Sequence, residues 1–223
     1  MRKWFFLSIG QKYLIGLTGL GLALFVLLHM LGNLLIFAGD KAYNLYMHQM
    51  VNSKAAFIIQ VGLLTSFLLH IILTLCLSVK NYLSRPKKYA RPASGWKATA
   101  WYQKSLIFQG AIILVFVILH LITFKYGTYY EVTYEGKTIR NLYLLVEEVF
   151  QNPITVIWYL LALLILSLHL FHGLGSSFQS LGLSHPRFEG GIKHISAIYA
   201  TLVTAGYISL PLYVFFFMAE KGG

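Results

Sequence analysis

The sequence has few charged residues, since Asp, Glu, Lys and Arg make up 11% of its 223 residues. A typical soluble domain carries about a quarter. Hydrophobic residues make up 57%. The shortage of charge excludes an ordinary water-soluble domain and indicates that lipid is the solvent. Five stretches contain no Asp, Glu, Lys or Arg, and these are residues 13–37, 55–79, 105–124, 154–178 and 195–219.

Each of these stretches is long enough to cross a membrane, because a hydrocarbon core of about 30 Å needs roughly 20 apolar residues in a helix. Lipid offers the backbone no hydrogen-bond partner, so the segments must be helices. The first stretch has no A-x-A-like cleavage site and is predicted to be a retained helix. We therefore predict an all-α integral membrane protein, with residues 1–223 forming a single bundle of five transmembrane helices.

Alternate connections between the predicted helices lie on the same side of the membrane, and on one side they contain almost no acidic residues. One side of the predicted membrane collects twelve basic residues and a single acid, Glu189, whereas the other has six basic residues and six acids. Basic residues concentrate in cytoplasmic loops, which predicts a cytoplasmic N-terminus and an external C-terminus. The net charge of +11 follows mostly from this topology. The basic loop 80–104 contains Trp96 and Trp101, which indicates either an interfacial aromatic belt or a docking surface for a cytoplasmic protein.

Four histidines lie within the predicted spans, one on each of the first four helices. An ionisable residue inside the membrane is a candidate functional site, although a neutral histidine bonded to a neighbouring helix is an alternative for each. Their depths follow from the direction of each helix. His29 lies 17 residues after Lys12 and His120 lies 16 after Lys104, about 25 Å from the inner boundary.

The other two histidines are predicted to lie nearer the inner side. His70 precedes Lys80 by ten residues, about 15 Å, and His169 is in the later half of a helix that also runs inward. The sequence therefore predicts an outer pair, His29 with His120, and an inner pair, His70 with His169.

The chemistry of a histidine pair in an apolar bundle favours haem. A zinc site normally has four ligands, and no Cys, Asp or Glu lies at these depths. Haem iron needs two axial ligands from the protein, and helical bundles commonly hold such sites. The chain has one cysteine, Cys76, and no C-x-x-C-H motif for covalent attachment. We therefore predict two non-covalent haems b, with the four histidines as iron ligands and with electron transfer as their chemistry.

Small residues and one further histidine accompany these ligands. Gly19 lies ten residues before His29, Gly110 lies ten before His120, and Gly173 follows His169 at i+4. They indicate either room for a haem edge or close helix packing. His172, one turn after His169, is a candidate haem contact or a competing ligand.

This pattern resembles the cytochrome b membrane-anchor subunit of succinate:quinone oxidoreductases (succinate dehydrogenase or fumarate reductase, respiratory complex II), in its single-chain, five-helix, di-haem type. The resemblance covers nearly the whole chain. It is carried by TGLGLALFVLLHMLGNLLIFAGD around His29, LLH ending at His70, QGAIILVFVILH ending at His120 and HLFHGLGSSFQSLG from His169. One axial histidine on each of the first four helices is the family's pattern.

The resemblance implies a multi-pass subunit of the bacterial inner membrane with no catalytic activity on its own. It implies a flavoprotein subunit with FAD and an iron–sulfur subunit, both on the cytoplasmic side, and a quinone, typically menaquinone, as electron partner. Two positions depart from the pattern, because Ser167 and Val51 stand where some relatives have a functional Glu. Asp40 and His48 are the nearest polar candidates for the quinone site, or are solvated loop residues.

Three other classes of protein are alternatives. A cytochrome b anchor of a hydrogenase or formate dehydrogenase also uses histidine pairs, but its soluble partners usually lie outside. A non-haem metal membrane oxidase needs several clustered histidines, and only His169 with His172 has that spacing. A transporter is disfavoured by the absence of charged residues in the spans and of matched broken helices.

Overall fold

Five long apolar helices dominate the computed structural model, which describes residues 8–84, 105–185 and 187–218. The spans are Ser8–Ala38, Lys54–Leu83, Leu106–Lys125, Pro153–Ser180 and Glu189–Met218. Each is long and apolar enough to cross a membrane, which confirms the five predicted helices. Residue 219 and nearly all of the basic loop 80–104 lie outside the described residues. Many large apolar side chains on the spans are exposed, as expected for surfaces that lipid covers.

Three of the five spans change helix type near the end of the bundle that carries α2 (Asp40–Asn52). The first consists of α1 (Ser8–Asn33) followed by the 3₁₀ turn η2 (Leu34–Ala38). The third consists of α5 (Leu106–His120) followed by the π-helical segment η4 (Leu121–Lys125), so that the α-helix ends at His120. The second and fourth spans are continuous helices, α3 (Lys54–Leu83) and α7 (Pro153–Ser180).

The fifth span is α8 (Glu189–Tyr213) followed by the π-helical segment η5 (Val214–Met218). Pro211 lies inside α8 and has no backbone N–H to donate, so the regular hydrogen-bond pattern is interrupted here. The amide of Gln151 donates to the Val214 carbonyl at 3.2 Å and satisfies one backbone group of this segment. Tyr199 and Tyr207 on α8 donate to the carbonyls of Ala23 and Val26 on α1. These bonds fasten α8 to α1 within the bundle.

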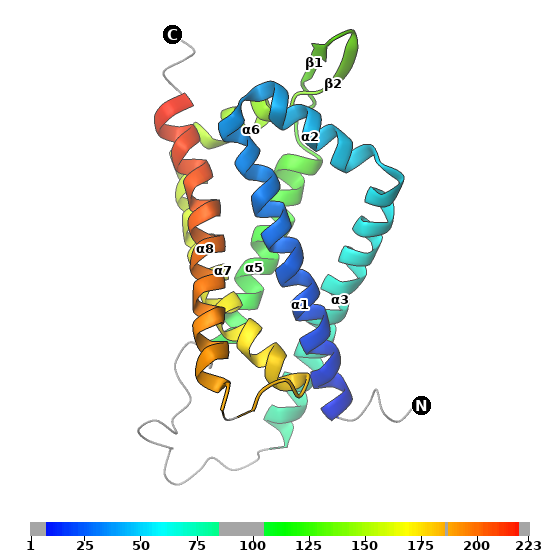
Figure 1. The fold of residues 1–223 in the computed structure, drawn as a ribbon, viewed down its shortest axis with the longest axis vertical. Coiled ribbons are helices and arrows are strands. Elements are labelled where there is room, and N and C mark those ends of the chain that lie inside the picture. The colour runs from blue at the N-terminus through cyan, green and yellow to red at the C-terminus, as the bar shows by residue number, and fades with distance from the viewer. Residues whose placement is uncertain (1–7, 85–104, 186, 219–223) are drawn as a thin grey trace.

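The connections at one end of the bundle form regular secondary structure, and they include a β-hairpin that the all-α prediction did not anticipate. They form α2 (Asp40–Asn52), a hairpin of β1 (Glu131–Tyr134) and β2 (Lys137–Arg140), and α6 (Leu142–Phe150). Figure 1 shows these elements together at the end of the bundle opposite the start of α1. We call them the polar cap. The hairpin turn Glu135–Gly136 has positive φ at both residues, as a type I′ turn requires.

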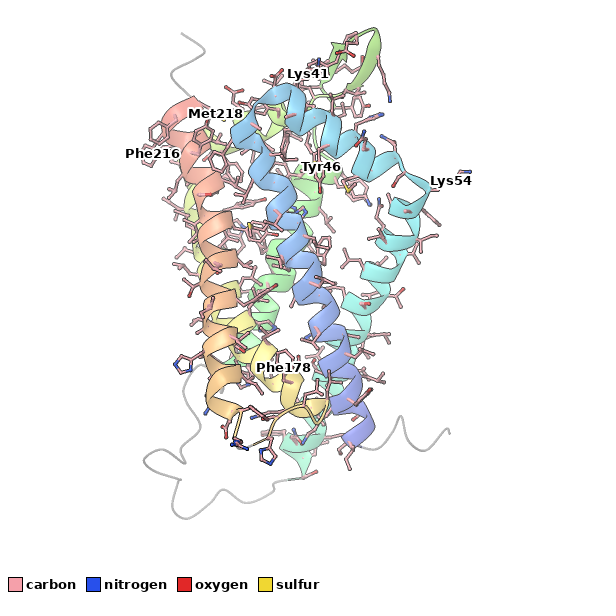
Figure 2. All side chains as sticks on the ribbon, viewed as in Figure 1. Lys41, Tyr46, Lys54, Phe178, Phe216 and Met218 are labelled. Carbon is pink, nitrogen blue, oxygen red and sulfur yellow. The ribbon has the colours of Figure 1, made fainter. Side chains whose placement is uncertain are left out.

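The polar cap is held together by contacts between distant segments. Lys41 on α2 donates to Glu135 in the hairpin turn at 2.7 Å, and the ammonium holds the pKa of that carboxyl below its usual value. Tyr134 donates to Asp40 at 2.8 Å. Asn44 is fully buried and donates to Tyr134 and to Asn141. Figure 2 shows Lys41 in this cap, and Lys54 where α2 turns into α3.

The buried core lies mainly where α2 and α6 of the polar cap pack against the ends of the spans. Its main cluster comprises Ile36, Tyr43, Val146, Phe150, Val156, Tyr159, Leu210, Val214 and Met218. A second cluster, Ala23, Leu170, Ala200 and Val203, joins α1, α7 and α8 deeper in the bundle. By contrast, α3 diverges from α1 toward the cap end, as Figure 1 shows, and Phe57 and Ile58 are 72% and 73% exposed. Its other half lies beside α1, where His70 is positioned.

Candidate haem sites in the helix bundle

The outer histidine pair comes together in the structure. His29 on α1 and His120 at the end of α5 have ring centroids 5.9 Å apart and perpendicular ring planes. A bond from a metal to an imidazole nitrogen is about 2.0 Å, so two imidazoles on opposite sides of one metal have centroids about 6 Å apart. The separation of the two rings therefore fits a pair of axial ligands to one iron.

Aromatic side chains surround the outer pair. The ring of Phe25 stacks on His29 with a centroid distance of 5.3 Å. Phe116 and Phe124 lie 5.9 Å and 5.1 Å from the His120 ring. Such apolar walls suit a large flat macrocycle, because they offer it no unsatisfied polar group.

Each outer histidine also has a polar neighbour. The hydroxyl of Tyr159 on α7 is hydrogen-bonded to His120 Nδ1 at 3.2 Å, which leaves Nε2 of His120 for another partner. Asn33 donates from Nδ2 to the His29 carbonyl at 2.8 Å, and this nitrogen lies 3.4 Å from His29 Nε2. Asn33 Oδ1 accepts a hydrogen bond from Tyr43 of α2. The polar cap is thus connected through Asn33 to the backbone and ring of His29.

The inner pair lies on α3 and α7. An electrostatic interaction between His169 and His70 indicates that the two side chains lie near each other. The Nδ1 atom of His70 is 3.2 Å from the hydroxyl of Thr18 on α1. Nδ1 of His169 is buried and has no hydrogen-bond partner among the described residues. A buried polar atom without a partner is unusual in proteins and is consistent with a ligand at this position.

The glycines singled out by the sequence have different surroundings. A Cβ atom on Gly19 would lie 3.4 Å from His70 Cε1 and 3.1 Å from Ser177 Oγ. A Cβ atom on Gly110 would lie 4.0 Å from His169 Cε1, whereas one on Gly173 would meet nothing within 4 Å. Gly19 and Gly110 therefore border the inner histidines, and not the outer histidines that follow them ten residues later on the same helices.

The remaining candidates are separate from the two pairs or peripheral to them. His172 is half-buried and close enough to His169 for an electrostatic interaction, so its part as haem contact or competing ligand stays a prediction. Asp40 and His48 lie eight residues apart on α2 in the polar cap. Asp40 is exposed and accepts a hydrogen bond from Tyr134, and His48 is paired with Asn52 at 3.0 Å. Both residues therefore take part in hydrogen bonds within the polar cap. Their assignment to a quinone site stays a prediction.

Three polar neighbours of the histidines were not singled out from the sequence, namely Thr18, Asn33 and Tyr159. Asn33 had a local signal, because it follows His29 at i+4, the spacing at which helical side chains meet. Thr18 and Tyr159 lie on other helices from the histidines they contact, 52 and 39 residues away. No pattern within one helix reveals such contacts.

The set of possible ligand residues narrows the chemistry of the site. Across the described ranges, no three His, Cys, Asp or Glu side chains are grouped as ligands of a metal ion. The bundle instead contains pairs of histidines, which suit the two axial ligand positions of a haem iron. No protein-family model, curated protein or solved structure matches the chain. The fold therefore defines a multi-pass membrane protein with five apolar helices, and the inference about its function depends on the histidines.

Proposed function

We propose that this protein is the di-haem cytochrome b membrane anchor of a succinate dehydrogenase or fumarate reductase in a bacterial inner membrane. The observation that carries the proposal is the 5.9 Å separation of the His29 and His120 rings, which lie among the aromatic side chains of Phe25, Phe116 and Phe124. The second pair, His70 and His169, supports it, because His169 carries a buried nitrogen with no partner in the described chain.

The protein's own residues would hold and orient two haems b. His29 and His120 would hold the outer haem, and His70 and His169 the inner one. Bound haem would supply one-electron transfer, and two histidine ligands on each iron leave no open position for a substrate. The aromatic side chains around the outer pair would exclude water from it.

The two ends of the bundle differ in a way that supports this role. The polar cap contains Asp40, Glu131, Glu135, Glu147 and Glu148 together with basic residues, whereas the connections at the other end are predominantly basic in sequence. By the charge rule the polar cap faces outward. The iron–sulfur and flavoprotein subunits would then dock at the cytoplasmic end, and the outer haem would exchange electrons with a quinone, which we propose to be menaquinone.

A reduced-minus-oxidised absorption spectrum of the purified protein tests the proposal. We expect two b-type haems per chain in the wild-type protein. His29→Leu and His120→Leu should each remove the same haem and leave the other, because either change deletes an axial ligand. His48→Leu is the matched control, since His48 lies in the polar cap, and it should retain both haems. A colourless protein, or loss of different haems in the two ligand variants, would contradict the proposal.

The partners need a separate experiment. Co-expression with iron–sulfur and flavoprotein subunits of a succinate dehydrogenase should give a membrane complex that reduces a menaquinone analogue with succinate. A protein that retains two haems but assembles with hydrogenase or formate dehydrogenase subunits would instead support the alternative anchor.

A further inference from the structure

Thr18 on α1 contacts the ring of His70 on α3. Its Oγ1 atom lies 2.8 Å from the Leu14 carbonyl oxygen, 3.1 Å from the Ile15 carbonyl oxygen and 3.2 Å from His70 Nδ1. Two of these neighbours are backbone carbonyls, which accept hydrogen bonds and never donate them. The hydroxyl has one proton, so its donor capacity is used by its own helix.

This arrangement assigns the proton on the histidine. Because the Thr18 hydroxyl donates its proton to the α1 backbone, Thr18 Oγ1 can only accept a hydrogen bond from His70 Nδ1. His70 Nδ1 must then carry the hydrogen and donate it. A neutral imidazole protonated on Nδ1 has its free lone pair on Nε2.

The backbone beside Thr18 also limits where the ring can lie. A Cβ atom at Gly19 would be 3.4 Å from His70 Cε1, so the absence of a side chain there lets the imidazole approach α1 closely. Thr18 and Gly19 thus together position the His70 ring against α1. His169 differs, because its Nδ1 atom has no hydrogen-bond partner within the part of the chain that the structure describes.

We propose that Thr18 is a positioning residue for the inner haem, which holds His70 in the Nδ1-protonated form and presents Nε2 to the iron. This inference rests on the proposed function. A hydrogen bond donated by the distal nitrogen of a ligating imidazole makes the ligand more basic. A more basic ligand stabilises oxidised iron more than reduced iron, so Thr18 lowers the midpoint potential of the inner haem.

The test is a redox titration of three variants in the whole protein. Thr18→Val keeps the branched shape and removes the hydroxyl, and it should raise the potential of one haem and leave the other unchanged. Thr18→Ser restores the hydroxyl and should return the potential toward the wild-type value. Thr65→Val is the matched control, because Thr65 also donates to a carbonyl of its own helix, at 2.8 Å, but is exposed on α3. It should leave both potentials unchanged.

A second measurement, on the unaltered protein, keeps the test decisive if Thr18→Val fails to fold. In the reduced wild-type protein, ¹⁵N NMR of labelled histidine, assigned with His70→Gln, should show His70 protonated on Nδ1. A proton on Nε2, or unchanged potentials in a folded Thr18→Val protein, would overturn the inference while leaving two haems in place. Absence of haem from the wild-type protein would instead overturn the proposed function, and the NMR result would still report on Thr18.

Discussion

Removing the hydroxyl of Tyr159 separates two contributions that this side chain makes. The residue is 8% exposed, and its ring meets Phe116 and Phe150 edge to face, both with centroid distances of 4.9 Å. Its hydroxyl is hydrogen-bonded to His120 at 3.2 Å. Tyr159→Phe deletes the hydrogen bond and keeps the ring, whereas Tyr159→Ala deletes both.

The expected costs of the two substitutions differ by several-fold. Hydrogen bonds between transmembrane helices contribute about 0.6 kcal/mol on average and about 1.7 kcal/mol at most. We therefore expect Tyr159→Phe to lower the free energy of unfolding by about 1 kcal/mol. Tyr159→Ala also loses two aromatic pairs and leaves a cavity, and truncating a buried aromatic residue to alanine costs about 3–5 kcal/mol.

Unfolding in detergent by titration with SDS, followed by circular dichroism, measures both values. Tyr207→Phe is the matched control, because its hydroxyl donates to the Val26 carbonyl at 2.8 Å and not to a histidine. It should cost a similar free energy and leave the proposed outer haem unchanged. Tyr159→Phe should shift the potential of that proposed haem alone. If Tyr159→Phe were as costly as Tyr159→Ala, the assignment of most of the stability to ring packing would be wrong.

Two further predictions concern a glycine and an ion pair. Gly19→Val should lower the free energy of unfolding by about 1–3 kcal/mol, because a Cβ atom at this position meets neighbours at 3.1–3.4 Å. Gly21→Val is the control, since nothing lies within 4 Å of a Cβ atom there. In the same SDS titration it should change the free energy of unfolding by less than about 0.5 kcal/mol. The hydrogen bond from Lys41 lowers the pKa of Glu135. This contact therefore stabilises the polar cap fully at pH values above the ordinary carboxyl pKa, and the stabilisation is lost as the pH falls through the lowered pKa. A ¹³C NMR titration should show the pKa of Glu135 rising in Lys41→Met, and an unchanged pKa would refute the pairing.

The sequence alone was sufficient for the five spans. Charge-free stretches of this length have one stable conformation in lipid, because the backbone must satisfy its hydrogen bonds within a helix. The described spans begin and end within a few residues of the charges that bound those stretches. The relative depth of the histidines was predicted from helix geometry, since a helix rises 1.5 Å per residue from a boundary marked by Lys or Arg. That reasoning paired His29 with His120, and their rings lie 5.9 Å apart.

The polar cap was not predicted, although part of its signal was present. The segment EVTYEGKTIR has β-branched residues on both sides of Glu135–Gly136, which is typical of a hairpin with a two-residue turn. Tyr43 and Met47 are spaced i, i+4 and pack at the main core cluster, as on one face of a helix. Both signals are short. Their elements are stabilised by contacts such as Lys41 with Glu135, 94 residues apart in the chain.

Only the tertiary structure decided which residues surround each histidine. Ten residues make about 2.8 turns of a helix, so Gly19 and His29 point in different directions, and Gly19 borders His70 on the neighbouring helix. Likewise, Thr18 and Tyr159 reach His70 and His120 from separate spans. Sequence fixes the depth of a residue in the membrane through the helical rise. The rotation of each helix about its axis depends on its packing against the others, and this rotation determines the partner of each histidine nitrogen.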